Sequence, residues 1–116
     1  MFNYKTIKPE KCLFYEVASL EELKKSKRLY FEIDSKAIVL FEVASELYAI
    51  GDICTHDDGP LGDGALEGYV VTCPRHGAQF DVRDGKVLSL PAIIDIPAYP
   101  VRVVEGKIEI GVPIDE

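Results

Sequence analysis

The feature that most constrains this chain is the placement of its cysteines and histidines. Two of the three cysteines and both histidines fall in two tight pairs, Cys54-Thr55-His56 and Cys73-Pro74-Arg75-His76. Thiolate sulfur and imidazole nitrogen are common protein ligands for iron, zinc and copper. Four such side chains in matched pairs predict a metal centre, rather than two buried cysteines and two surface histidines.

The spacing within the first pair favours a two-iron cluster over a single zinc ion. Paired ligands of a structural zinc are normally separated by about two to four residues, whereas one residue separates Cys54 from His56. In an extended segment, such residues point to the same side with their Cα atoms about 6 to 7 Å apart. That separation suits two different atoms of a cluster.

Further motifs make the chain similar to the Rieske iron-sulfur proteins. The two pairs, with Gly77 after the second, resemble the family's C-x-H and C-P-x-H-G signatures. The resemblance covers about the last two-thirds of the chain. It implies one [2Fe-2S] cluster, with Cys54 and Cys73 on the inner iron and His56 and His76 on the outer, solvent-facing iron. The likeness also includes Leu61 to Gly64, Phe80-Asp81, Gly85-Lys86, Leu90-Pro91-Ala92 and Tyr99 to Val103.

Departures from the respiratory-chain branch of the family point to its small, low-potential ferredoxins, including those that feed bacterial oxygenases. That branch has a disulfide between two further cysteines, whose positions here are Gly59 and Arg75. It also has a serine and a tyrosine that donate to sulfur, where this chain has Ala78 and Phe80. Hydrogen bonds to sulfur stabilise the reduced cluster, so we expect a potential near the bottom of the Rieske range.

Residues beside the ligand motifs are expected to act around the cluster. Pro91 matches the proline loop that shields the cluster in the family, although a plain turn proline is the alternative. Arg75 is expected at the cluster rim, as a docking contact, as a charge that tunes the potential, or as a solvated side chain. Asp57 and Asp58 either steer a basic partner or belong to a solvated loop.

The rest of the sequence predicts an all-β domain with one short helix. The helix is expected to begin after Ser19, where Glu22 completes a capping box. The length of 116 residues fits a single domain, and the resemblance implies an antiparallel β-sandwich or barrel. A small cluster-binding subdomain is expected at about residues 51–92, within a β base formed by the rest. Strands are expected at residues 28–33, 37–43, 47–50, 69–73, 78–82, 99–104 and 107–110, the last two as a half-buried ribbon.

Charge and composition exclude several classes of partner. The net charge is -7, and residues 51–68 hold five acidic side chains without Lys or Arg. Because such a field repels phosphate, we expect no nucleic-acid partner. The opening MFNYKTIKPEKC lacks a signal-peptide pattern, and no apolar run approaches the roughly 20 residues that span a bilayer. We therefore expect a cytoplasmic protein without membrane contact, and we assign Cys12 no role.

The resemblance implies an electron-transfer protein rather than an enzyme. We expect a one-electron carrier between a flavin-dependent reductase and an oxygenase or other acceptor, with the electron passing at the edge of His56 and His76. A chain of 116 residues leaves no room for an oxygenase's catalytic domain. The alternatives are a small subunit of a reductase or of an iron-sulfur assembly system. A structural Cys2His2 zinc module and a cysteine hydrolase are less favoured.

Overall fold

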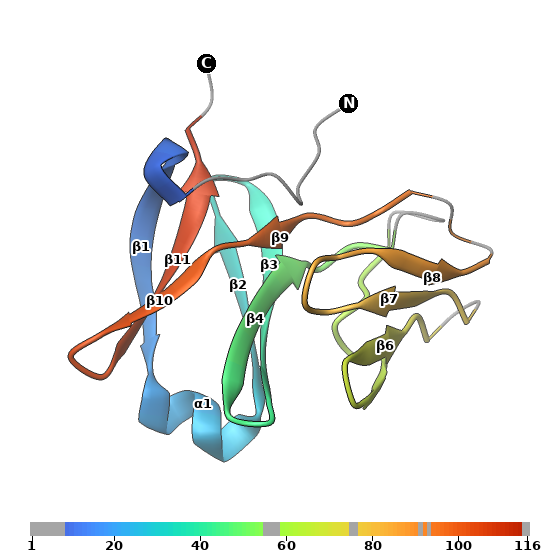
Figure 1. Cartoon of the computed structure of the whole chain (residues 1–116), viewed down its shortest axis with the longest axis horizontal. Coiled ribbons are helices and arrows are strands. Elements are labelled where there is room, and N and C mark those ends of the chain that lie inside the picture. The colour runs from blue at the N-terminus through green and yellow to red at the C-terminus, as the bar shows by residue number, and fades with distance from the viewer. Residues whose placement is uncertain (1–8, 55–58, 75–76, 91, 93, 115–116) are drawn as a thin grey trace.

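The computed structural model describes residues 9–54, 59–74, 77–90, 92 and 94–114. In these ranges the chain forms a 3-10 turn η2 (Pro9–Lys11), one α-helix and three antiparallel sheets (Figure 1). The helix is α1 (Leu20–Ser26). The strands are β1 (Cys12–Ser19), β2 (Arg28–Ile33), β3 (Lys36–Val43), β4 (Glu46–Gly51), β5 (Ala65–Glu67), β6 (Val70–Thr72), β7 (Gln79–Asp81), β8 (Val87–Ser89), β9 (Ala98–Tyr99), β10 (Val101–Val104) and β11 (Lys107–Pro113).

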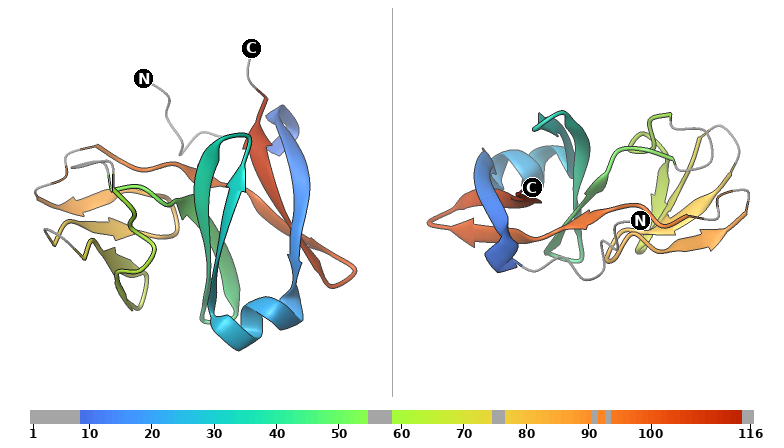
Figure 2. Two further views of the ribbon diagram at one scale, coloured as in Figure 1. Left: turned by 180° about the vertical axis from the view of Figure 1, so that it is seen from behind. Right: turned by 90° about the horizontal axis from the view of Figure 1, so that it is seen from above.

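The three sheets lie as successive layers. Sheet A has the strand order β1-β11-β10, sheet B has β2-β3-β4-β9, and sheet C has β5-β6-β7-β8. The right-hand view of Figure 2 shows sheet B between the other two. No helix within the described ranges is long and apolar enough to cross a membrane.

Sheet B is buried on both faces, and β3 shows why. Its residues Ile38, Val39, Leu40 and Phe41 are all fully buried. Ile38 and Leu40 belong to the core shared with sheet A, whereas Val39 and Phe41 belong to the core shared with sheet C. A strand with two buried faces needs a continuous apolar run rather than an alternating one. The sequence of β3 meets that need.

The structure confirms the all-β antiparallel fold and the start of the helix. The Glu22 N–H donates to Ser19 Oγ at 3.1 Å, and the Ser19 N–H donates to Glu22 Oε1 at 3.1 Å. One predicted strand, residues 99–104, is wrong as a single element. It is interrupted at Pro100 into β9 in sheet B and β10 in sheet A. Proline has no N–H to donate to a ladder, so the chain changes sheets there.

Three strands were not predicted from the sequence: β1, β5 and β8. β1 pairs with β11, but its register shifts between Glu16 and Ala18, which breaks the regular alternation. β5 and β8 each have three residues, too few to show a period. The expected ribbon exists as β10 and β11, yet Val103 is exposed because β10 is an edge strand of sheet A.

Candidate metal centre

The two predicted cysteine ligands are buried in the core between sheets B and C. Cys54 follows β4 and Cys73 follows β6. Their exposed fractions are 0% and 2%. One cluster of packed side chains contains both cysteines together with Leu61, Ala78 and Phe80. Two distant parts of the sequence therefore bring their thiols into the same apolar region.

Each of these cysteines opens a loop that is closed by the same kind of backbone hydrogen bond. The Cys54 N–H donates to the Gly59 carbonyl at 2.7 Å, and the Cys73 N–H donates to the Ala78 carbonyl at 2.7 Å. The Gly77 N–H also donates to the Cys73 carbonyl, at 3.1 Å, from a left-handed backbone with φ of 80°. Because β6 and β7 pair on either side of it, the second loop is the tip of a hairpin.

The two predicted histidine ligands, His56 and His76, lie outside the described residues. In the sequence, His56 falls between the closing residues of the first loop and His76 between those of the second. Among the residues that are described, no group of three or more His, Cys, Asp or Glu side chains could hold a metal ion. The predicted flanking residues Asp57, Asp58, Arg75 and Pro91 also lie outside the described ranges.

The segment after the first loop is held by Asp52, a residue that the sequence analysis did not single out for the site. Asp52 Oδ1 accepts hydrogen bonds from the N–H groups of Leu61, at 2.9 Å, and Gly62, at 2.6 Å. A Cβ on Gly64 would lie 1.8 Å from the Thr72 carbonyl oxygen. Gly64 therefore lies directly against β6, and its N–H donates to the Leu61 carbonyl at 2.9 Å to close a turn.

The described surroundings of the cysteines fit an iron-sulfur centre. A thiolate in an apolar core is costly unless a cation or hydrogen bonds compensate its charge. Ala78 and Phe80 are fully buried in the same cluster as Cys73, and neither side chain has a hydroxyl to donate. Two buried thiols and two nearby imidazoles in sequence are a donor set suited to iron.

A second group of contacts joins sheets B and C away from the loops. The rings of Tyr48 and Tyr69 meet edge to face, with centroids 5.9 Å apart. The Arg83 guanidinium lies 4.2 Å from the Tyr69 ring centroid and pairs with Asp81 at 2.8 Å. Its hydrogen bond holds the pKa of the Asp81 carboxyl below the ordinary value. These contacts fix the layer from which the second loop projects.

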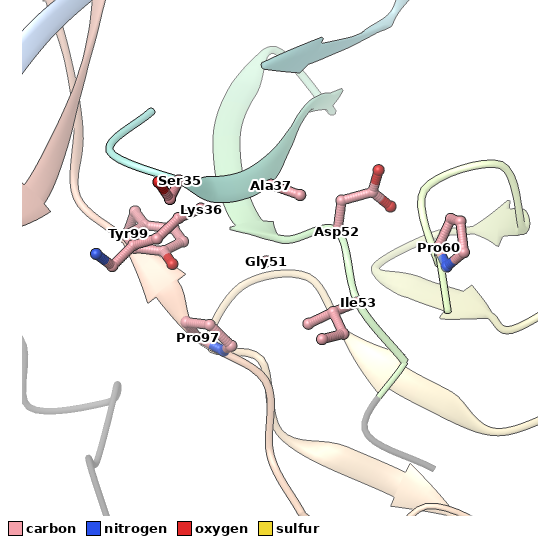
Figure 3. Close-up of a pocket in the computed structure, with 9 residues that line it drawn as sticks. All are labelled: Ser35, Lys36, Ala37, Gly51, Asp52, Ile53, Pro60, Pro97 and Tyr99. Carbon is pink, nitrogen blue, oxygen red and sulfur yellow. The ribbon is translucent and has the colours of Figure 1, made fainter. Parts of the chain in front are cut away.

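A hollow of about 460 Å³ lies beside the first loop (Figure 3). Ile53, directly before Cys54, lines it, and so does Pro60, which follows the loop. On the other side Figure 3 shows Lys36, Pro97 and Tyr99. None of the lining residues is a predicted ligand, so the hollow borders the candidate centre without being part of it.

Comparison with known proteins decides the class of the centre. The family model described as the Rieske [2Fe-2S] domain matches residues 13–100. The chain belongs to this family. Rieske domains carry a [2Fe-2S] cluster with two cysteine and two histidine ligands, so the expected cofactor is confirmed. The family assignment does not support a zinc module or a cysteine hydrolase.

Relatives place this Rieske domain among ferredoxins. It is 38% identical over 88 residues to the ferredoxin component of the naphthalene 1,2-dioxygenase/salicylate 5-hydroxylase systems of Ralstonia sp, covering 76% of this chain and 85% of the relative. It resembles the ferredoxin of carbazole 1,9a-dioxygenase from Nocardioides aromaticivorans IC177, with 29% identity and a TM-score of 0.79 over 87% of this chain and 98% of that one.

A second similar structure contains a ferredoxin bound to its oxygenase. It is a complex of reduced oxygenase and oxidized ferredoxin in carbazole 1,9a-dioxygenase, with 26% identity and a TM-score of 0.77. The match covers 84% of this chain and 92% of the other. The relatives are electron carriers rather than catalytic oxygenases. This confirms the prediction of an electron-transfer protein.

Proposed function

We propose that this Rieske protein takes single electrons from a flavin-dependent reductase and delivers them to the terminal oxygenase of a dioxygenase system. The observation that carries the proposal is the pair of matched loops, each opened by a buried cysteine and each containing one histidine in sequence. The relatives' ferredoxin role supports the oxygenase as acceptor. We propose the cytoplasm as the location, because cysteine thiols stay reduced there.

The proposed cluster ligands are Cys54, His56, Cys73 and His76. The family's cluster needs two histidines, and this chain has only two. Of its three cysteines, Cys12 lies at the start of β1 in sheet A, whereas the other two share the core between sheets B and C. The proposed cluster-binding part is about residues 51–92 of a single domain, a range that includes the whole of sheet C.

The chain's own residues prepare this site by excluding water and fixing the ligands. When bound, the cluster supplies a centre that accepts and releases one electron. Cys54 and Cys73 keep their sulfurs within an apolar core. The hydrogen bond from each cysteine's N–H, to Gly59 in the first loop and to Ala78 in the second, holds that loop closed. On this proposal the cysteines bind the inner iron, and the histidines bind the iron nearer to solvent, where a partner can approach.

Three exposed apolar side chains close to Pro91 in sequence, here called the apolar patch, support docking near this site. Leu88, Leu90 and Ile94 are 46%, 75% and 43% exposed. Leu88 lies on β8, and Leu90 directly precedes the proposed shielding proline, Pro91. Neighbouring exposed apolar side chains commonly mark a surface that binds another protein. We propose that the oxygenase covers this patch, with Asp57, Asp58 and Arg75 as further contacts.

Ligand replacement tests the assignment. Cys54→Ser and His76→Ala are expected to lose the bound iron and its visible absorption, because each removes a ligand that organises its loop. Cys12→Ser is the matched control and is expected to keep both. Retention of an intact cluster by either ligand variant would contradict the assignment, as would zinc in the native protein in place of iron.

A further inference from the structure

Two side chains from the edge of sheet B converge on the backbone that follows the first ligand loop. Arg28 and Tyr30 are separated by one residue on β2, so they lie on the same face of the strand. Arg28 Nη1 donates to the carbonyl of Gly62 and, at 3.0 Å, to that of Gly64. The single hydroxyl hydrogen of Tyr30 is shared between the Gly62 carbonyl, 3.1 Å from Oη, and Asp63 Oδ1, 2.5 Å from Oη.

Gly62 is enclosed by these contacts on several sides. Its N–H donates to Asp52 while its carbonyl accepts from Arg28 and Tyr30. A Cβ on Gly62 would lie 2.6 Å from Tyr30 Cε2, 3.0 Å from Asp52 Oδ1 and 3.1 Å from Val39 Cγ2. No larger residue fits without moving these neighbours. Arg28, Tyr30 and Asp52 therefore hold both polar groups of the Gly62 backbone.

The same contacts reach the core that contains the cysteines. The Arg28 guanidinium lies 5.1 Å from the ring centroid of Phe41. Phe41 packs in the same buried cluster as Cys54, Cys73 and Leu61. Burial and the hydrogen bond to Asp63 raise the pKa of Tyr30, so its hydroxyl remains a donor at neutral pH.

We propose that Arg28 and Tyr30 are positioning residues for electron transfer, which hold the Gly62 backbone so that the first ligand loop and its cluster keep a single environment. The proposal rests on the ligand assignment above. One end of the loop is fixed because Cys54 follows β4 closely. The other end is fixed through Leu61 and Gly62. Hydrogen-bonding groups that are already in place need not rearrange when an electron reaches the cluster. Hydrogen bonds to the residues around a metal site also orient its ligands.

Sheet A supplies a matched control for a purely structural role. Arg102 also lies over an aromatic ring, 3.9 Å from the centroid of Phe14. It also forms an ion pair, with Glu109 at 2.6 Å. Both partners belong to sheet A, which is separated from sheet C by sheet B (Figure 2). Loss of Arg102 therefore reports on the fold but not on the ligand loop.

The test compares Tyr30→Phe, Arg28→Met, Arg28→Lys and Arg102→Met in the cluster-loaded protein. Tyr30→Phe keeps the ring beside Gly62 and removes only the hydroxyl. The measurements are the EPR line width of the reduced cluster, the rate of cluster loss to a chelator, and the unfolding temperature. We expect Tyr30→Phe and Arg28→Met to broaden the EPR lines and to accelerate cluster loss about fivefold for each hydrogen bond removed. Arg28→Lys should restore part of both properties.

Arg102→Met is expected to leave the EPR lines and the rate of cluster loss unchanged, even where it lowers the unfolding temperature. The proposal is overturned if Tyr30→Phe and Arg28→Met have native line widths and native rates of cluster loss. It is also overturned if Arg102→Met changes these properties as much as they do. A native protein without a [2Fe-2S] signal would instead overturn the ligand assignment.

Discussion

Around Cys73, the buried side chains set the chemical environment that we expect to lower the reduction potential. Ala78 and Phe80 are fully buried beside it and carry no hydroxyl. Ala78→Ser offers a new donor to the cluster region, and a hydrogen bond to sulfur favours the reduced state. A bond of about 1 kcal/mol corresponds to a rise of about 40 mV in midpoint potential. Protein-film voltammetry measures the shift.

The matched control for this prediction is Ala65→Ser, at an exposed position on β5, which should leave the potential unchanged. The double variant Ala78→Ser with Phe80→Tyr should have a higher potential than the native protein. A midpoint that stays constant or falls in Ala78→Ser, with the cluster intact, would contradict the proposed effect of the missing hydroxyl donors on the potential.

The sequence predicted the residues of the candidate centre only where their chemistry is visible in the residue type. Cysteine and histidine at Rieske spacings indicate a cluster by themselves. Arg28, Tyr30 and Asp52 were missed because their partners, apart from the Asp63 carboxylate, are backbone groups of Leu61, Gly62 and Gly64, which no sequence pattern marks. The available signal was weak: Arg28 and Tyr30 alternate with apolar residues on β2 and so share one face.

At the scale of elements, the ion pair between Asp81 on β7 and Arg83 predicts how stability depends on pH. Arg83 holds the pKa of Asp81 below its ordinary value. The stabilisation is therefore complete above the unfolded-state pKa, and it is lost as the pH falls through the lower folded-state value. Asp81→Asn should reduce the free energy of unfolding at neutral pH and should weaken its decline in acid.

Urea unfolding between neutral pH and about pH 2 measures this difference. Glu67→Gln, at an exposed position on β5, is the control and should follow the native curve. Parallel curves for Asp81→Asn and the native protein, at all pH values, would show that the pair adds no pH-dependent stability.

Elements were predictable where runs of apolar and β-branched residues were bounded by short polar turns. β2, β3 and β4 were placed to within about one residue, because short polar turns separate them. The conformation of those turns was not predictable. Ala44 and Ser45 have φ of 53° and 68°, a region that usually favours glycine or asparagine, and neither residue type signals it. The three-residue strands β5 and β8 of sheet C are defined by their pairing partners and not by their own sequence.

For the whole molecule, the layered arrangement separates the proposed docking patch from sheet A and so permits a matched test of partner binding. Leu90→Asp places a charge in the patch beside the proposed centre, at a side chain that is 75% exposed. Leu13→Asp places the same charge on β1, at a side chain that is 54% exposed. We expect Leu90→Asp to lower kcat/KM of the oxygenase for the reduced carrier about tenfold, because a central apolar contact is worth more than about 1 kcal/mol. Leu13→Asp should have little effect.

Stopped-flow oxidation of the reduced carrier by its oxygenase measures these rates, and voltammetry shows whether the cluster is unchanged. Equal rates for both variants and the native protein would contradict docking at this patch. The double variant Asp57→Lys with Asp58→Lys separately tests whether these two charges steer a basic partner, an effect that should weaken as the salt concentration rises.

The order of the three sheets could not be predicted from the sequence, which indicated only a sandwich or barrel with a subdomain. Apolar residues show that a strand is buried, but they do not show which sheet covers each face. The exchange of sheets at Pro100 and the double burial of Ile38 to Phe41 depend on pairings between distant strands. Such pairings appear only in the structure.

Mössbauer spectroscopy of the oxidised protein, loaded with iron-57, tests how the four proposed ligands are divided between the two irons. Two cysteine ligands on one iron and two histidine ligands on the other make the two irons chemically different. We predict two quadrupole doublets of equal area, from two irons in each chain. A single doublet would show equivalent irons, and it would contradict the proposed division of Cys54 and Cys73 from His56 and His76.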